Sequence, residues 1–251
     1  MTKTPLNQLD VSLIIDTTGS MSALLDVARR HVARLIRETI GPAGMDLRVA
    51  VIEYRDHPTE AREFVTRVHP LTEKLPAVQG YLDGLRADEG GDIPEAVYDA
   101  LVAACTLPWR ANARRIAILV GDAPPHDPCG CGETAETIAA RCEGAGLMLY
   151  ALPLTTQARP AFQQLARRTG GESFETGVDQ AMTHLQAVLS TEIANIAQEQ
   201  QVFAAIQELP DQAWSLDAVS EAVGMNRHTV ARLVSRLGAR GFLAAATPVG
   251  G

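Results

Sequence analysis

The sequence has few aromatic residues, few cysteines and no long hydrophobic run. Aromatic residues make up only 4% of the 251 residues, so a core must be built mostly from aliphatic side chains. Four cysteines at uneven spacing do not form the framework of a disulfide-rich secreted domain. No stretch approaches the ~20 apolar residues that span a bilayer, and residues 1–8 lack the apolar core of a signal peptide. We therefore expect a cytoplasmic chain that makes no contact with a membrane.

Positively charged residues are also fewer than negatively charged ones. The chain has 22 Lys and Arg residues against 30 Asp and Glu residues, a formal net charge of -8. This balance argues against a protein that coats nucleic acid or an anionic membrane without specificity. The sequence contains no nucleophile elbow, glycine-rich phosphate loop or metalloprotease motif. Asp56 and His57 lie between an arginine and a proline, which indicates a structural turn rather than a catalytic pair. We therefore expect no enzymatic activity.

Apolar runs alternate with amphipathic segments over most of the chain. This alternation is typical of a mainly parallel sheet with helices on both faces. We expect an antiparallel edge strand at residues 64–69 and further strands at 11–15, 47–54, 115–120, 147–152 and 172–175. We expect helices at residues 24–36, 73–85, 95–107, 135–145 and 162–169. The predicted fold class is a doubly wound α/β fold, followed by a small all-α helix-turn-helix domain.

The most informative segment follows the first of these strands. Asp16, Thr18 and Ser20 alternate directly after the apolar run at residues 11–15, so one curved turn can point three oxygens at a single spot. Open α/β sheets bind ligands beyond the carboxyl ends of their strands. Carboxylate and hydroxyl oxygens suit a hard cation, Mg2+ above all. Gly19 permits the tight backbone that brings the loop close to such an ion.

This segment resembles the metal-ion-dependent adhesion site of von Willebrand factor A-type (vWA) domains, whose first loop reads Asp-x-Ser/Thr-x-Ser. Residues 90–97, Gly-Gly-Asp-Ile-Pro-Glu-Ala-Val, resemble the second loop of a vWA subgroup. Residues 116–126 resemble the third loop, where a buried strand ends in an aspartate. The resemblance covers roughly the first three quarters of the chain. It implies a vWA fold and a metal site made of Asp16, Thr18, Ser20, Asp92 and Asp122.

One residue departs from the family pattern. Most members have a threonine where Asp92 falls, and three carboxylates around a divalent ion would leave the site net negative. This weakens the attraction of an acidic group unless one carboxylate binds through water. The resemblance implies Mg2+ as the cofactor, with Mn2+ or Ca2+ as alternatives, and a protein partner that supplies an acidic side chain. Bacterial domains of this type often work beside ATPase chaperones or signalling and defence proteins.

The hydrophobic pattern changes after residue 178. One long helical stripe begins at Val178 and meets no turn signal before Leu209 and Pro210. Only its first half is needed to cover the sheet, and we place the domain boundary near Ala194. Residues 1–194 then form the vWA domain, and residues 195–251 form a connector helix and a helix-turn-helix domain.

The segment after residue 209 has the pattern of a helix-turn-helix. Ser215 is expected to cap a helix at residues 216–223, Gly224 to form the turn, and Asn226 to cap a longer helix. Residues 242–244 are expected to form a short strand. The segment resembles the winged helix-turn-helix domains of bacterial regulators, although the sequence stops before a second wing strand.

The resemblance implies how this module would contact DNA. The N-terminal end of the recognition helix, where base edges are met, carries Asn226, Arg227, His228 and Thr229. Arg232 and Arg236 lie one turn apart and are placed to contact phosphate. The rest of the module is acidic, which removes the broad positive surface of a strong DNA binder. The module is therefore expected to dock either DNA or a protein.

Four residues between positions 126 and 142 raise the question of zinc: His126, Cys129, Cys131 and Cys142. Cys129 and Cys131 would have to converge across a single glycine, a tighter spacing than the usual two to four residues. Cys142 and Cys105 fit core positions instead. The spacing therefore argues against zinc, and more strongly against a Cys129–Cys131 redox pair.

These observations lead to three hypotheses. The first is a non-enzymatic, Mg2+-dependent protein-binding protein. In the vWA family, ligand binding is coupled to the last helix, which here continues into the connector, so occupancy of the metal site is expected to reposition the helix-turn-helix. The second is a DNA-binding regulator whose vWA domain dimerises or senses an effector. The third is an enzyme that uses the same metal for phosphate or peptide hydrolysis.

Overall fold

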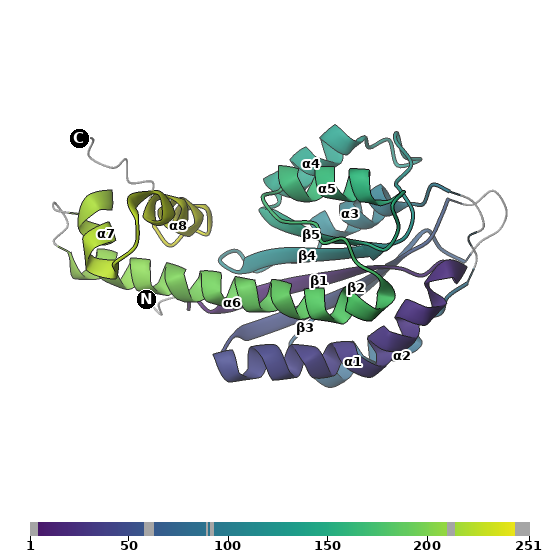
Figure 1. Cartoon of the computed structure of the whole chain (residues 1–251), viewed down its shortest axis with the longest axis horizontal. Coiled ribbons are helices and arrows are strands. Elements are labelled where there is room, and N and C mark those ends of the chain that lie inside the picture. The colour runs from purple at the N-terminus through teal and green to yellow at the C-terminus, as the bar shows by residue number, and fades with distance from the viewer. Residues whose placement is uncertain (1–4, 58–62, 89, 91–92, 210–213, 244–251) are drawn as a thin grey trace.

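A five-stranded sheet in the order β3-β2-β1-β4-β5 forms the centre of the molecule (Figure 1). The computed structural model describes residues 5–57, 63–88, 90, 93–209 and 214–243. The strands are β1 (Gln8–Asp16), β2 (Asp46–Tyr54), β3 (Thr66–Thr72), β4 (Arg114–Gly121) and β5 (Leu147–Pro153). β1, β2, β4 and β5 are parallel, and β3 runs antiparallel at one edge. The predicted α/β class with a mixed sheet is confirmed.

Helices cover both faces of this sheet. One face carries α1 (Ser22–Ile40), α2 (Leu75–Gly84) and the first half of α6 (Val178–Glu208), and the other carries α3 (Val97–Cys105), α4 (Ala135–Gly144) and α5 (Arg159–Arg168) (Figure 1). Leu13 and Ile15 of β1 belong to the first core, and Ile14 belongs to the second. A strand buried on both faces needs a nearly continuous apolar run, which residues 11–15 supply.

The strand expected at residues 172–175 is reduced to a single bridge between Ser173 and Ala151. The Phe174 N–H still donates to the Ala151 carbonyl at 2.9 Å. The Phe174 ring, however, stacks on His184 of α6 with the ring centroids 5.2 Å apart. The chain therefore leaves the sheet here to begin α6, and packing against that helix ends the ladder.

The C-terminal helices pack on the second half of α6. α6 is 31 residues long, which at the rise of an α-helix gives a rod of about 46 Å that passes Ala194 without a break. α7 (Leu216–Val223) and α8 (Arg227–Ala239) share a small core with it: Val202, Val219, Val230, Leu233 and Leu237. Both predicted helices are confirmed. In the described residues, no helix combines the length and the apolar character needed to cross a membrane.

The caps of α7 and α8 also follow the prediction. Ser215 Oγ accepts a hydrogen bond from the Ala218 N–H at 3.2 Å, and Asn226 Oδ1 accepts one from the Thr229 N–H at 2.8 Å. Gly224 ends α7 with a φ of 66°, a left-handed conformation that glycine adopts without strain.

The short strand expected at residues 242–244 is not formed in its described part. Phe242 and Leu243 form a bend, and Ala244 lies outside the described residues. The Phe242 ring packs edge-on against Phe203 of α6 with centroids 6.0 Å apart, and the Arg240 guanidinium lies 5.0 Å from the Phe242 centroid. Phe242 thus completes the small C-terminal core instead of starting a wing.

The prediction against a Cys129–Cys131 pair is wrong, because a disulfide joins the two residues. The turn between them brings their Cα atoms to 5.2 Å, and Gly132 continues it with a φ of 85°. Cys142 is a buried core residue and Cys105 packs against the same core, with their sulfurs 3.5 Å apart. The expected core positions of Cys105 and Cys142 are confirmed.

Candidate metal site at the carboxyl edge of the sheet

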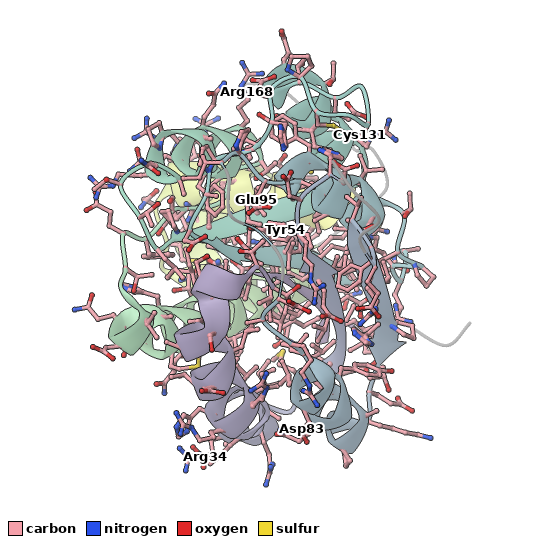
Figure 2. All side chains as sticks on the ribbon, turned by 90° about the vertical axis from the view of Figure 1, so that its right-hand side faces the viewer. Arg34, Tyr54, Asp83, Glu95, Cys131 and Arg168 are labelled. Carbon is pink, nitrogen blue, oxygen red and sulfur yellow. A yellow bond between two sulfur atoms is a disulfide. The ribbon has the colours of Figure 1, made fainter. Side chains whose placement is uncertain are left out.

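The candidate site lies where the parallel strands end. Asp16, Tyr54 and Gly121 are the last residues of β1, β2 and β4. Parallel strands present their carboxyl ends at one edge of a sheet, where open α/β folds bind ligands. Figure 2 looks onto this edge, and Tyr54 and Glu95 lie near the centre of the view. The first and third loops therefore begin side by side.

Asp16 holds the first loop in shape. Asp16 Oδ1 accepts hydrogen bonds from the Thr18 N–H at 2.8 Å and from Thr18 Oγ1 at 2.7 Å. Thr18 Oγ1 in turn lies 3.3 Å from Ser20 Oγ. Asp16 and Thr18 are buried, whereas Ser20 is exposed. The loop therefore leads from a buried carboxylate to a hydroxyl that faces solvent, with three oxygens in a connected row.

The second carboxylate oxygen of Asp16 lacks such support. Among the described residues, none donates a hydrogen bond to Asp16 Oδ2, although it is buried. Burial raises the pKa of Asp16 to about 7, the neighbouring Asp122 carboxylate adds to this shift, and the hydrogen bonds from Thr18 oppose it. A buried carboxylate beside a second one needs a cation to remain ionised at neutral pH. These residues therefore fit a divalent cation.

Two glycines let the loops approach each other. A Cβ at Gly121 would lie 2.1 Å from Tyr54 Oη and 3.4 Å from Asp16 Oδ2. Gly90 has a φ of +83°, and a Cβ there would lie 2.9 Å from the Cβ of Thr18. Any side chain at either position would force the loops apart. The second loop thus touches the first at Gly90, while Asp92 lies outside the described residues.

A cleft of about 410 Å³ opens over these loops. Three lining residues with polar side chains lie outside the predicted ligand set: Glu95, Thr155 and Gln157. Thr155 Oγ1 donates to the backbone carbonyl of Asp122 and so fixes the third loop. Glu95 belongs to the second-loop motif, but Thr155 and Gln157 follow β5 in a segment with no recognisable pattern. Their place in the cleft comes from the tertiary fold.

Tyr54 is a further residue that the sequence pattern did not mark. Its hydroxyl donates to the Val120 carbonyl at 3.4 Å. Burial raises the pKa of Tyr54 well above its ordinary value, and the charges of Asp16, Glu95 and Asp122 raise it further. Tyr54 therefore remains a neutral hydroxyl group. Glu95 and Asp122 also line the cleft, and their carboxylates give it a negative potential that attracts cations.

Solved structures with the same arrangement of elements identify the fold. A von Willebrand factor type A protein from Catenulispora acidiphila superposes with a TM-score of 0.57 at 16% identity, over 74% of this chain and 43% of that one. The fold is von Willebrand factor A-like. The pilus adhesin SpaC from Lactobacillus rhamnosus GG, in an open conformation, gives a TM-score of 0.55 at 14% identity, over 76% of this chain and 30% of SpaC. We refer to the sheet, α1 to α5 and the first half of α6 as the vWA-like part.

Sequence comparisons find segments of larger proteins, and no family model matches the chain. The ariadne-like RING finger protein R811 of Acanthamoeba polyphaga mimivirus is 29% identical over 118 residues. Alpha-protein kinase vwkA of Dictyostelium discoideum is 24% identical over 119 residues. Each match covers 47% of this chain, but only 11% and 19% of the respective relatives. This chain therefore corresponds to a small fraction of the length of these relatives.

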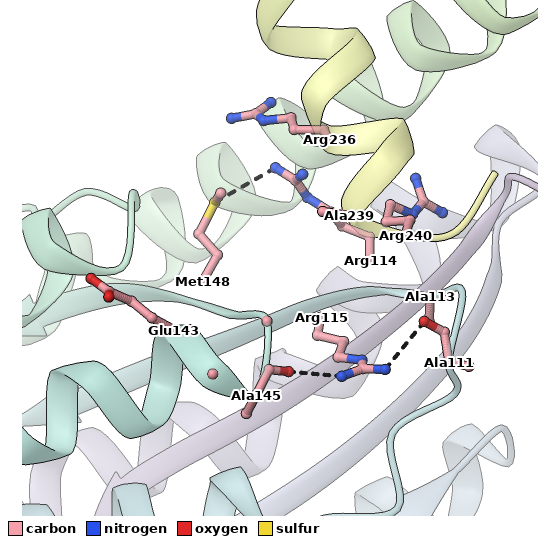
Figure 3. Close-up of a pocket in the computed structure, with 12 residues that line it drawn as sticks. Ala111, Ala113, Arg114, Arg115, Glu143, Ala145, Met148, Arg236, Ala239 and Arg240 are labelled. Atoms are coloured by element: carbon pink, nitrogen blue, oxygen red, sulfur yellow. Dashed lines mark hydrogen bonds between the residues drawn. The ribbon is translucent and has the colours of Figure 1, made fainter. Parts of the chain in front are cut away.

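The residues predicted to contact DNA face in different directions. Asn226, Arg227, His228 and Arg232 are exposed on α8, and Thr229 is half-buried. Arg227 lies 3.5 Å from the Asp217 carboxylate of α7. Arg236, in contrast, lines a cleft of about 330 Å³ between α8 and the amino ends of β4 and β5 (Figure 3). Arg236 is therefore turned toward the vWA-like part.

A buried ionic network holds α8 against the vWA-like part. Arg114, at the start of β4, donates to Glu192 and Glu199 of α6, and Arg240 donates to Glu199 from the end of α8. Arg240 also donates to the Asn112 carbonyl at 3.0 Å. Burial alone would raise the pKa of Glu192, but the Arg114 guanidinium and further hydrogen bonds hold it below its usual value. The network joins residues on both sides of position 194. The domain boundary near that residue stays a prediction.

Proposed function

We propose that this chain is a Mg2+-dependent protein-binding protein whose metal site takes an acidic side chain from a partner. The observation that carries the proposal is the buried Asp16 carboxylate, which interacts with Asp122, a residue that lines an open cleft. Asp16, Thr18 and Ser20 would hold the ion directly or through water, and Asp92 and Asp122 would complete its ligand sphere. The bound ion would supply the positive charge that attracts a carboxylate.

The lining of the cleft supports binding rather than catalysis. Among the described residues that line it, none is a histidine or cysteine that would serve as base or nucleophile. A cation surrounded by carboxylates also acidifies its bound water only weakly. Ile93 lies at the cleft and is 56% exposed, so it offers a partner an apolar contact beside the acidic group. These features favour a non-enzymatic adaptor.

Selection of displayed peptides tests this proposal without a known partner. A random peptide library on phage would be bound to the immobilised full chain in Mg2+ and eluted with EDTA. We expect enrichment of peptides that contain Asp or Glu, binding by the wild type, and loss of binding in Ser20→Ala. Ser22→Ala is the matched control, because Ser22 is also exposed and begins α1 two residues later. Selected peptides that bind Ser20→Ala as well as the wild type would contradict the proposal.

α6 provides the physical connection between the metal site and the C-terminal helices. The Leu154 N–H donates to the Gly121 carbonyl at 2.9 Å, and the Thr176 N–H donates to the Pro153 carbonyl at 3.5 Å, just before α6 begins. The far half of α6 carries Glu199 of the buried network. We infer that occupancy of the metal site shifts α6 and repositions α7 and α8, which serve as a docking module.

Hydrogen exchange measures this coupling. Addition of Mg2+ and a selected acidic peptide should change the amide protection of α7 and α8 in the wild type and leave it unchanged in Ser20→Ala. Unchanged protection of both helices in the wild type, under conditions where the peptide is bound, would contradict the coupling.

A second candidate function is DNA binding by α8, in a regulator whose vWA-like part dimerises or senses an effector. The observation that favours it is the exposed cluster of Arg227, His228 and Arg232 on one helix. Binding to a DNA duplex should then weaken as salt increases, decrease in Arg232→Ala and be unaffected by EDTA. Absence of duplex binding at low salt would contradict this function.

A further inference from the structure

A second set of metal-ligating side chains lies in the loops that follow β2 and β4. His57 Nε2 is 2.9 Å from Asp99 Oδ2 on α3. Donor atoms of Asp99, Cys129 and Cys131 all lie within 4.8 Å of one another. A Cβ at Gly130 would lie 3.2 Å from His57 Nε2, so the turn that carries both cysteines also packs on the imidazole. The donors of Asp99, Cys129 and Cys131 therefore lie together, and His57 adjoins them through its contacts with Asp99 and the turn at Gly130.

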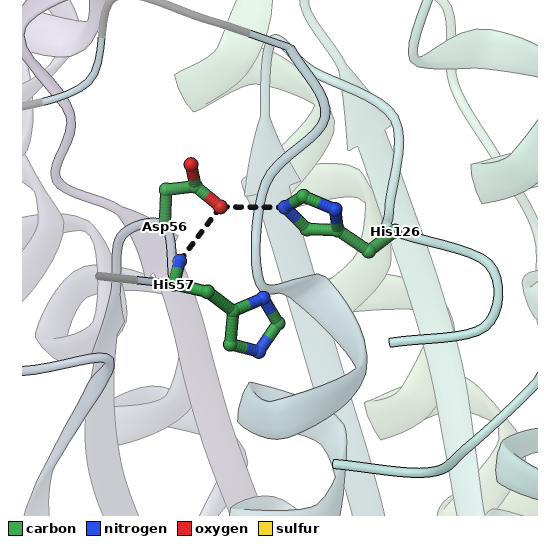
Figure 4. Close-up of side chains that lie close together, drawn as sticks. All are labelled: Asp56, His57 and His126. Atoms are coloured by element: carbon green, nitrogen blue, oxygen red, sulfur yellow. Dashed lines mark hydrogen bonds and ion pairs between the residues drawn. The ribbon is translucent and has the colours of Figure 1, made fainter. Parts of the chain in front are cut away.

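Asp56 and His126 contact His57 and support its position (Figure 4). Asp56 Oδ1 accepts a hydrogen bond from the His57 N–H at 2.7 Å and lies 2.6 Å from His126 Nε2. The His57 and His126 ring centroids are 4.9 Å apart. Asp56 is buried, so these contacts hold the backbone of His57 and the ring of His126 in fixed positions. His57 is thus preorganised.

The short spacing of the two cysteines does not oppose a metal site in this fold. The turn at Gly130 already brings both sulfurs together, since they are bonded to each other. A tetrahedral zinc site with bonds of about 2.0–2.3 Å places neighbouring donor atoms roughly 3.3–3.8 Å apart. The donor atoms of Asp99, Cys129 and Cys131, all within 4.8 Å, need only small movements to reach that spacing. Thiolate and imidazole ligands select zinc-like ions over Mg2+.

We propose that reduction of the Cys129–Cys131 disulfide creates a Zn2+ site with His57, Asp99, Cys129 and Cys131 as ligands. A phosphine reductant breaks the S–S bond: phosphorus gives up two electrons, and water supplies the oxygen of the phosphine oxide and the hydrogens of the two thiols. Zn2+ then displaces one proton from each thiol and binds both thiolates. A small-molecule disulfide, itself reduced to two thiols, re-forms the protein disulfide and releases the ion.

Cobalt titration tests the site in the full chain. The protein would be reduced with a phosphine, stripped of metal, saturated with Mg2+ and titrated with Co2+. We expect one equivalent to bind, with a thiolate-to-cobalt charge-transfer band and the intense visible bands of a tetrahedral ion, and Zn2+ should displace it. The bands should vanish in Cys131→Ser and after reoxidation. His57→Gln and Asp99→Asn should weaken affinity on the order of a hundredfold, because each removes one of four ligands.

Two control variants distinguish this site from the other cysteines and from the Mg2+ site. Cys105→Ser should keep the bands, because Cys105 packs beside Cys142 and forms no disulfide. Asp16→Ala should also keep them, so failure of the Mg2+ site and failure of this site give different results. Circular dichroism would verify that each variant is folded. The proposal is overturned if the reduced wild type shows no charge-transfer band, if folded His57→Gln and Asp99→Asn bind as tightly as the wild type, or if the oxidised protein binds equally well.

Discussion

The buried Asp16 carboxylate makes the stability of the ion-free protein depend on pH in a definite direction. Burial, together with the nearby Asp122 charge, raises the Asp16 pKa from 3.8 to about 7. Between these values the folded state holds a proton that the unfolded chain has released, so the free energy of unfolding falls as pH rises. A shift of roughly three pH units corresponds to about 4 kcal/mol. Above about pH 7, this penalty is fully present.

Asp16→Asn removes the titration and keeps the shape of the side chain. Urea unfolding in EDTA, followed from about pH 4 to about pH 8, should show the wild type losing about 4 kcal/mol relative to the variant. Saturating Mg2+ should remove this difference in slope, because the ion stabilises the ionised carboxylate. Sodium chloride at equal ionic strength is the control for screening. Parallel pH dependence of the two proteins in EDTA would refute the reasoning.

The other predictions concern the loop contacts and the network under α8. A Cβ in Gly121→Ala would clash with the Tyr54 hydroxyl and crowd Asp16 Oδ2, so we expect the free energy of unfolding to fall by about 1–3 kcal/mol and the calorimetric Mg2+ affinity to weaken. Unchanged affinity would contradict this. Glu199→Gln leaves Arg114 and Arg240 short of a buried counter-charge and should lower stability by about 3–5 kcal/mol. Glu208→Gln, on the exposed end of the same helix, should change stability by less than about 0.5 kcal/mol. If Glu199→Gln and Glu208→Gln lowered stability equally, the result would argue against the network. The Glu192 pKa is held below 4.5, so the ionised carboxylate stabilises the fold above that pH, and this contribution is lost in more acidic solution. In urea unfolding at decreasing pH, Glu192→Gln should therefore lose less free energy of unfolding than the wild type. Identical pH dependence of the two proteins would contradict this.

Much of the fold and the first loop could be predicted because the deciding signals are local. The apolar run at residues 11–15 predicts a buried strand, and the alternating Asp16, Thr18 and Ser20 follow it directly. Strand periodicity and the rule that parallel strands share a carboxyl edge then place Asp122 beside Asp16. The caps at Ser215 and Asn226 are equally local, since each depends on a hydrogen bond to an amide three residues later.

Contacts between distant segments could not be predicted in the same way. Tyr54 and Thr155 reach the site through packing that no local pattern records. The strand at residues 172–175 is lost because Phe174 stacks on a helix that follows it. The pairing of Cys129 with Cys131 depends on the path of one turn, which residue spacing alone does not determine.

The central claim is that this edge of the sheet binds Mg2+ through Asp16, and calorimetric titration of the full chain tests it most directly. Mg2+ would be titrated into the metal-free wild type, Asp16→Ala and Ser22→Ala, with the last as a control for changes in the same loop region. We predict one bound ion per chain for the wild type and Ser22→Ala, and no binding for Asp16→Ala. Equal Mg2+ binding by the wild type and Asp16→Ala would contradict the account.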